Sequence, residues 1–373
     1  MSIIKGSVFG NDRKAFKRLV VLYLFLAICL MFAACDSQQA SQNASQQQTV
    51  ESDQAKKPGY MIAIEKGDYE TALKELRPLA EKGDAHAQYN LGLMYAKGYG
   101  ILQDYQEAAK WWGLASEKGE RHAQYNLGFL YRKGQGVAKN CKSAEMWWRK
   151  SAKQGFILAQ SDLAAMYGTG ACEPVLQDYV ESAKWAKMAA EQNYAMAQYN
   201  LGTYYEYGKG VRQDYKEAAR WYRKAAEQGD ARAQNNLGLL YEKGRGLSQD
   251  EQEAVKWYLK AAEQDHGYAQ FNLGKKYDDG KGVAQDHSEA IRLYLLAAKK
   301  DISNAQVMLG VKYYKGEGVK QDFIQAYKWF YIAAQKGYEP AQKAIKLTSK
   351  HIKQSQVEEA IRLAKEENIS SVN

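Results

Sequence analysis

The chain contains few cysteines and histidines, which often bind metals, and few prolines, which break helices. Its 373 residues include four prolines, four cysteines and five histidines. So few prolines permit many helices, and 31 glycines can supply the turns between them. The histidines are too scattered for a shared metal, so we expect surface side chains and no cofactor at His86, His122, His266, His287 and His351.

Motifs of known catalytic chemistry are missing as well. Ser-x-x-Lys occurs only from Ser2 to Lys5, and Lys-Thr-Gly is absent. The Gly-x-Gly turns lack the Gly-Lys-Ser or Gly-Lys-Thr ending of a phosphate-binding loop. We therefore expect a protein that is not an enzyme.

A strong excess of one charge is also lacking. The formal net charge is +9, but the first 34 residues contribute +4 of it, which leaves +5 for the rest of the chain. So small an excess is weak support for nucleic-acid binding. We expect no nucleic-acid partner.

The N-terminal segment has the layout of a secretory signal peptide. Lys17 and Arg18 precede an apolar run over residues 19–34. This run of about 16 residues is short for a membrane-spanning helix. Residues 35–59 are rich in Gln, Ser and Asp and show no hydrophobic periodicity, so they are expected to form a flexible tether.

From residue 60 onward one pattern repeats. In each unit, apolar or small residues such as Ala87, Leu91 and Tyr95 fall on one face of a predicted helix, helix A, which ends at a glycine pair such as Gly98 and Gly100. An Ala-Gln pair recurs every 36 residues, with one spacing of 38, beginning at Ala87, Ala123, Ala159, Ala197, Ala233, Ala269, Ala305 and Ala341.

A second helix, helix B, follows in each unit. It begins at an Asp with a Glu three residues later, as in Asp104 and Glu107, which predicts an N-cap with a reciprocal acidic partner. An aromatic pair such as Trp111 and Trp112 comes next. One such hairpin cannot bury its aromatic face alone, so the units must stack. The sequence predicts an all-α fold, a right-handed superhelical α-solenoid of helix-turn-helix repeats.

The ends of the array differ from its middle. Residues 60–84 are expected to form an N-terminal capping segment with a lone B-type helix that starts at Asp68. Seven full repeats fill residues 85–338. Residues 339–373 then form a half repeat and a capping helix, for which Ser355 and Glu358 predict a capping box.

Two resemblances follow from these residues. Ala-Gln-Tyr-Asn-Leu-Gly, the Gly-x-Gly loop and Gln-Asp-Tyr resemble the Sel-one-like repeat, a relative of the tetratricopeptide repeats. This implies a protein-binding scaffold or adaptor; secreted bacterial members are associated with host interaction, envelope functions and immunity against phospholipase effectors of type VI secretion. Phe32-Ala33-Ala34-Cys35 resembles the bacterial lipobox, which implies a mature N-terminus lipidated at Cys35.

The lipobox also bears on location. A lipid anchor on Cys35 implies a membrane-bound protein that faces the periplasm. Asp36 resembles the signal that retains lipoproteins in the inner membrane, and the outer membrane stays open as an alternative.

Two cysteines remain in the repeats, Cys141 and Cys172. Both are expected on the loop edge of adjacent units, and the loop of the second holds the two-residue insertion. An even pair in an exported protein invites a disulfide. The alternative is two unpaired thiols.

A polar and aromatic row on helix A is the candidate partner site. Related scaffolds hold a bound peptide backbone with asparagines of helix A, whereas the alternative role is hydrogen bonding between neighbouring repeats. The candidates are Asn90, Asn126, Asn200, Asn236 and Asn272, with Tyr89, Tyr125 and Tyr199 beside them.

Three functions remain open at this point. The first is a protein-protein interaction scaffold anchored to a membrane. The second is an immunity protein that neutralises a type VI secretion lipase or phospholipase, and the third is a structural envelope protein that binds the cell wall.

Overall fold

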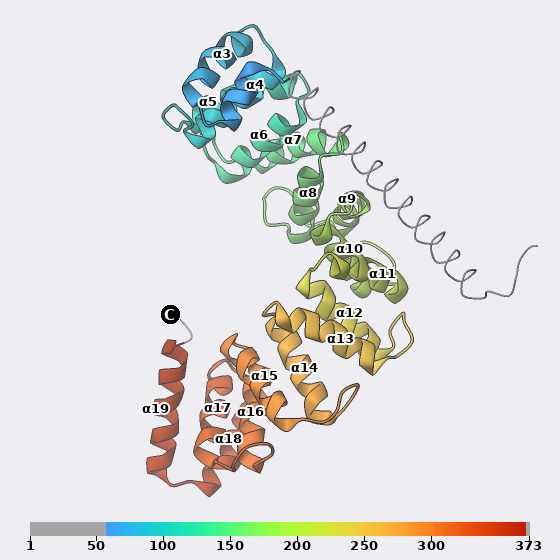
Figure 1. Cartoon of the computed structure of the whole chain (residues 1–373), viewed down its shortest axis with the longest axis vertical. Helices are drawn as coiled ribbons and strands as arrows, with labels where there is room; N and C mark the ends of the chain where they lie inside the picture. Colours follow the sequence, from blue (N-terminus) through green and yellow to red (C-terminus); the bar gives the residue numbers. More distant parts are fainter. Residues whose placement is uncertain (1–56, 371–373) are drawn as a thin grey trace, which may run out of the picture.

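A computed structural model describes residues 57–370, and the secondary-structure elements in this part of the chain are helices joined by loops (Figure 1). The signal-peptide prediction and most of the tether lie outside the described residues. The helices are α2 (Gly59–Glu65), α3 (Tyr69–Glu81), α4 (Ala85–Lys97), α5 (Tyr105–Glu117), α6 (Arg121–Lys133), α7 (Cys141–Lys153), α8 (Ile157–Thr169), α9 (Tyr179–Glu191), α10 (Ala195–Tyr207), α11 (Tyr215–Glu227), α12 (Ala231–Lys243), α13 (Glu251–Glu263), α14 (Gly267–Asp279), α15 (His287–Lys299), α16 (Ser303–Lys315), α17 (Phe323–Gln335), α18 (Glu339–Thr348) and α19 (Gln354–Ser370), with a short 3-10 turn at Ser349–His351.

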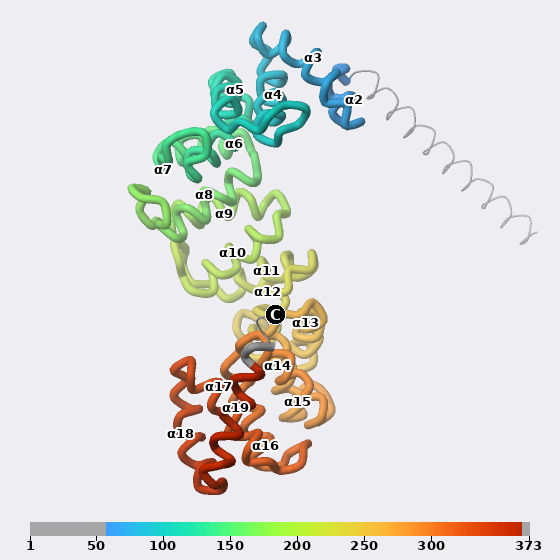
Figure 2. The backbone as a smooth tube through the Cα atoms, turned by 90° about the vertical axis from the view of Figure 1, so that its left-hand side faces the viewer, coloured from blue at the N-terminus to red at the C-terminus, as the bar shows by residue number. Residues whose placement is uncertain are grey.

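Consecutive helices form hairpins that stack along a curved path. The even-numbered helices from α4 to α16 are helix A of the repeats, and the odd-numbered helices from α5 to α17 are helix B. Each helix B packs against helix A of its own repeat and against helix A of the next one. The turned view in Figure 2 follows the row from α2 to α18 and α19. The described part of the chain is thus an α-solenoid.

The helix ends follow the predicted signals in part. Gly98 ends α4 in the left-handed conformation with φ of 70°, as its place at a helix C-terminus predicts. Asp104 caps α5 by accepting hydrogen bonds from the backbone N–H groups of Gln106 and Glu107. The prediction that Glu107 is the reciprocal partner of Asp104 in a capping box is wrong, however. The backbone N–H of Asp104 donates to the carbonyl of Tyr95 at 2.9 Å, because the loop folds back on helix A, and Glu107 pairs with Lys110 instead.

Both ends of the array differ from expectation in detail. Asp68 caps α3, but α3 is not alone, since α2 precedes it and packs against it. At the other end, α19 begins at Gln354, so Ser355 lies inside the helix. The backbone N–H of Lys353 donates to Oε1 of Gln356 at 2.9 Å. The predicted box of Ser355 and Glu358 is therefore wrong by two residues.

The terminal helix does not complete an eighth repeat. Helix α18 packs on α17 as a helix A would, and α19 also packs on α17. Nζ of Lys328 on α17 lies 2.8 Å from Oε2 of Glu367 on α19. The last full repeat is thus covered by two helices that both contact it.

Candidate interaction surface on the helix A row

A buried glutamine fixes how each helix A faces its neighbour. In the seven full repeats the Gln of the Ala-Gln pair is buried, and its Nε2 donates at 3.0 to 3.5 Å to a carbonyl of helix B in the preceding unit. The next two residues of helix A, such as Tyr89 and Asn90, are only half-buried. The row predicted from sequence therefore lies on an accessible face of the solenoid.

Along this row, side chains of neighbouring repeats bond to one another. The hydroxyl of Tyr125 donates to Oδ2 of Asp162 at 2.9 Å, and Nδ2 of Asn272 donates to Oδ1 of Asn235 at 2.9 Å. Tyr89 and Asn126, 37 residues on, interact in the same register. The polar row thus serves contacts between repeats, which is the alternative role that the sequence left open.

These contacts change the acidity of the groups in the row. Burial, followed by the charge of Asp162, raises the pKa of Tyr125. Burial also raises the pKa of the Asp162 carboxyl, against the hydrogen bond from Tyr125 and the charge of Arg132. Tyr125 is therefore neutral at physiological pH and donates a hydrogen bond to Asp162.

A pocket of about 470 Å³ opens on this face across repeats four to seven. It gathers three of the predicted residues, Tyr199, Asn236 and Asn272, from α10, α12 and α14. Its other lining residues are Arg232, Asn235, Leu239, His266, Tyr268, Phe271 and Asn304. Four successive helices A thus contribute to one concave site.

The pocket combines one cation with aromatic rings and amides. The Arg232 guanidinium lies 4.3 Å from the centroid of the Tyr199 ring and 2.6 Å from Oδ2 of Asp230. Tyr268 is 59% exposed, which leaves its ring available to a partner. Burial lowers the pKa of His266, with Asp230 and Arg232 acting in opposite directions, so this imidazole is neutral at pH 7.

A second, smaller pocket lies near the start of the array. It measures about 280 Å³ between the first two repeats and includes Tyr125 and Asn126, with Phe129 and Trp112 in its wall. Tyr89, Asn90 and Asn200 line neither pocket. The amide of Asn90 donates instead to the carbonyl of His86 in its own helix at 2.9 Å.

The sequence prediction missed several lining residues, among them Arg232, Tyr268 and Asn304. All three stand one residue before the Ala-Gln pair, on the same helix face as the predicted row. That position is the signal that could have found them, because it changes in character from repeat to repeat: His86, His122, Leu158, Met196, Arg232, Tyr268 and Asn304. Of the histidines expected on the surface, His86 and His351 are exposed, whereas His122, His266 and His287 are half-buried. His266 lies at the N-cap of α14 and accepts from Ala269 N–H.

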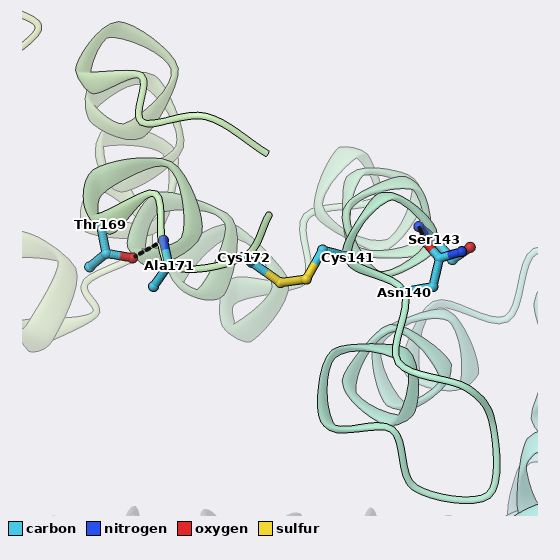
Figure 3. Close-up of a disulfide and its surroundings, with 6 residues drawn as sticks. All are labelled: Asn140, Cys141, Ser143, Thr169, Ala171 and Cys172. Atoms are coloured by element: carbon cyan, nitrogen blue, oxygen red, sulfur yellow. Dashed lines mark hydrogen bonds between the residues drawn. A yellow bond between two sulfur atoms is a disulfide. The ribbon is translucent and has the colours of Figure 1, made fainter. Parts of the chain in front are cut away.

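The two cysteines of the repeats form a disulfide between Cys141 and Cys172 (Figure 3). Cys141 begins α7, and Cys172 lies in the loop between α8 and α9. Their Cα atoms are 5.6 Å apart, and both side chains are buried. The bond joins the second repeat to the loop of the third.

The described residues include no group of His, Cys, Asp and Glu side chains that could hold a metal ion. In the same part of the chain, every helix is too short or too polar to cross a membrane. Cys35, the predicted lipidation site, lies outside the described residues.

The family model described as Sel1 repeat matches seven consecutive segments, residues 85–120, 121–156, 157–194, 195–230, 231–266, 267–302 and 303–338. No curated protein matches the sequence.

Two solved structures share the fold at moderate identity. A protective antigen of uropathogenic Escherichia coli strains, which displays an SLR fold, is 33% identical over 79% of this chain and 71% of its own, with a TM-score of 0.58. A Sel1 repeat protein from Oxalobacter formigenes is 31% identical over 74% of this chain and 80% of its own, with a TM-score of 0.61. The immunity protein Pa5087 from Pseudomonas aeruginosa is 23% identical over 58% of this chain and 82% of its own; its TM-score of 0.32 is too low to support an argument about function.

Proposed function

Because the chain belongs to the Sel1 repeat family, we propose that it is a non-catalytic scaffold that binds a partner protein on the helix A face of its solenoid. The observation that carries this proposal is the pocket shared by α10, α12, α14 and the start of α16. It is concave, partly aromatic and lined by amides that can hold a peptide backbone.

The lining residues suggest an extended segment as the bound part of the partner. Asn236 and Asn272 lie one repeat apart, a helix-packing distance of roughly 8–10 Å, so their amides can bond peptide groups about three residues apart. Tyr268 and Phe271 offer apolar contact area, and Arg232 offers a charge that Asp230 already partly neutralises. The pocket therefore favours a segment with an apolar or aromatic anchor and at most one acidic group.

A photo-crosslinking amino acid tests this site in cells. Placed at Tyr268, it should give one dominant protein adduct. The same substitution at His86, the equivalent and exposed position of the first repeat, should give much less of it. Tyr268→Ala and Arg232→Ala should each weaken binding of the captured protein by about tenfold, the usual effect of truncating a contact that dominates an interface.

A matched control keeps the test specific. Lys256→Ala removes an exposed side chain from helix B of the fifth repeat and should leave binding unchanged. Equal adducts from positions 268 and 86, or binding that survives both pocket variants, would contradict the proposed site.

We propose further that the scaffold is a lipoprotein anchored through Cys35 and facing the periplasm, with the inner membrane favoured by Asp36. The support is the order of cationic, apolar and small residues that ends at Cys35. Metabolic labelling with an alkyne fatty acid should mark the wild-type protein and leave Cys35→Ser unlabelled. Labelling of both forms, or of neither, would argue against this anchor.

A further inference from the structure

The second repeat carries a charge that the other repeats lack. The other six repeats range from −3 to +3 in net charge, whereas residues 121–156 hold eight basic residues and one acidic residue, a net charge of +7. The basic residues are Arg121, Arg132, Lys133, Lys139, Lys142, Arg149, Lys150 and Lys153, and the acidic one is Glu145.

Much of this surplus arises because acidic residues of helix B have been replaced. Five other repeats carry a Glu near the start of helix B that pairs with a Lys or Arg three residues later, at 2.7 to 3.3 Å. In the second repeat these two positions hold Ser143 and Met146. Lys153 stands where the first repeat has Glu117. The lysines of α7 thus lack the acidic residues that neutralise the basic residues of helix B in other repeats.

The unopposed lysines of α7 lie on one side of the helix. Lys142, Met146, Lys150 and Lys153 follow one another at intervals of four, four and three residues, which places them on one face. All four are exposed, as is Lys139 just before the helix. Nζ of Lys150 lies 4.1 Å from the centroid of the Trp147 ring. We call Lys139, Lys142, Met146, Trp147, Lys150 and Lys153 the α7 stripe.

Within the described residues, none of the four stripe lysines has a carboxylate within ion-pair distance, whereas Arg149 on the same helix is paired with Glu145 at 3.0 Å and with Glu181 at 3.1 Å. The helix is also fixed at its start, because Cys141 is bonded to the loop of the third repeat. The α7 stripe is therefore a rigid row of free cations with Met146 and Trp147 among them.

We propose that the α7 stripe docks the solenoid onto an anionic phospholipid surface. Lysines are flexible point charges that suit a diffuse layer of phosphates, whereas bidentate carboxylate recognition favours arginine. Lysine is also depleted in the cores of protein interfaces. Met146 is exposed among these lysines and adds an apolar side chain that can enter the headgroup region, whereas the half-buried Trp147 packs against the core of the first repeat. These features favour a lipid surface over an acidic protein.

Docking through the α7 stripe is compatible with a membrane anchor at Cys35 but does not depend on one. The 22 residues from Asp36, which follows the predicted anchor Cys35, to Lys57 can span at most roughly 75 Å, which would hold the second repeat within reach of a bilayer. The stripe lies on helix B, whereas the pocket of the fourth to seventh repeats is lined by helices A and the N-cap of α14. A docked solenoid could thus keep that pocket free for its partner. If one of the two sites is disproved by experiment, the proposal for the other site still stands.

The test uses the full chain, purified and added to vesicles, with a photo-crosslinking residue at Met146. The control carries it at Lys256, the equivalent helix B position in the fifth repeat. In vesicles of phosphatidylglycerol and phosphatidylethanolamine, position 146 should yield lipid adducts and position 256 should yield at least tenfold fewer. Phosphatidylcholine vesicles or 0.5 M salt should reduce the adducts at position 146 by at least fivefold.

Removal of the cations gives an independent check. Lys142→Gln, Lys150→Gln and Lys153→Gln together should lower the adducts at position 146 by at least tenfold, since each lysine near an anionic surface contributes about fivefold in affinity. Circular dichroism should show an unchanged helix content for this variant. The proposal would be overturned by lipid adducts that do not depend on lipid charge or that are equal at positions 146 and 256. It would also be overturned if the adducts at position 146 in cells formed only with an acidic protein.

Discussion

Gly238 on α12 lies directly against the ring of Tyr258 on α13. A Cβ atom added at Gly238 would stand 2.7 Å from Cε1 of that ring. The same glycine faces a Trp, Tyr or Phe in five other repeats. The third repeat changes both partners together, with Ala164 for the glycine and Ala186 for the aromatic residue. Large against small is thus the rule that sets the distance between the two helices of a repeat.

This contact predicts opposite effects for two glycine substitutions. Gly238→Ala should destabilise the protein by about 1–3 kcal/mol, because the added methyl group overpacks against Tyr258. Gly113→Ala is the matched control, since a Cβ there meets nothing within 4 Å. It should stabilise the protein by about 0.5–1 kcal/mol through helix propensity alone. Urea unfolding measures both, and a stabilising Gly238→Ala would contradict the packing argument.

The buried glutamines predict that the same Gln→Leu substitution costs different amounts of stability in different repeats. Oε1 of Gln198 accepts from Nε2 of Gln228 at 2.7 Å, which links helix A of one repeat to the end of its helix B. In the first repeat the second partner is Lys118, and Oε1 of Gln88 has no hydrogen-bond partner. Gln198→Leu should therefore cost about 1–3 kcal/mol, because it removes two hydrogen bonds, one to the carbonyl of Ala190 and one from the amide of Gln228.

Gln88→Leu serves as the comparison for this ladder. It removes the bond to the carbonyl of Ala80 but also an oxygen that was already unsatisfied, so its cost should be smaller. Thermal unfolding of the two variants side by side gives the measurement. Equal losses would show that the bond between Gln198 and Gln228 adds nothing.

The repeat fold could be predicted from the sequence because its signals recur. Ala-Gln, the glycine pairs and the Asp caps each give weak local information, but each recurs at least six times at a nearly constant period. The reciprocal capping box failed because the backbone N–H of Asp104 has a competing acceptor, the carbonyl of Tyr95, that only the folded loop brings near. Local patterns do not reveal such a competitor.

The candidate site was predicted less completely. Repetition identified Asn236 and Asn272 because they recur, whereas Arg232 and Tyr268 were missed because each occurs once at its position. A binding site on a repeat array depends on such unrepeated residues. Accessible positions at which the repeats differ are therefore the sequence signal of such a site.

The disulfide predicts a redox-dependent stability. Cys141 and Cys172 are 31 residues apart in sequence, and a bond that closes a loop of this length stabilises the folded state by about 2–4 kcal/mol. Reduction should lower the midpoint of thermal unfolding of the wild type and leave that of Cys141→Ser/Cys172→Ser unchanged. An equal response of both proteins to the reductant would show that the bond is absent or without effect.

The last prediction concerns acid. Lys276 is 4% exposed in its side chain and lies between Glu242 at 2.8 Å and Glu251 at 2.7 Å, where the first repeat has Met94. Burial raises the pKa of the Glu242 carboxyl, but hydrogen bonds from Lys276 and Tyr258 and the charge of Lys276 outweigh it, so this pKa lies below its ordinary value of 4.5. A carboxyl with a lowered pKa in the folded state stabilises the protein above pH 4.5, and this contribution is lost as the pH falls through the folded-state pKa.

Glu242→Gln should therefore cost about 1–3 kcal/mol at pH 7, less than for a fully buried pair because Glu251 still neutralises Lys276. The difference from wild type should shrink steadily below pH 4.5, as the wild-type carboxyl becomes protonated and loses the same interaction. Glu253→Gln is the control: its pair with the exposed Lys256 lies on the surface, so the change should stay within about 0.5 kcal/mol at any pH. Urea unfolding at a series of pH values decides, because a difference for Glu242→Gln that does not vary with pH would show that the ion pair with Lys276 contributes no stability.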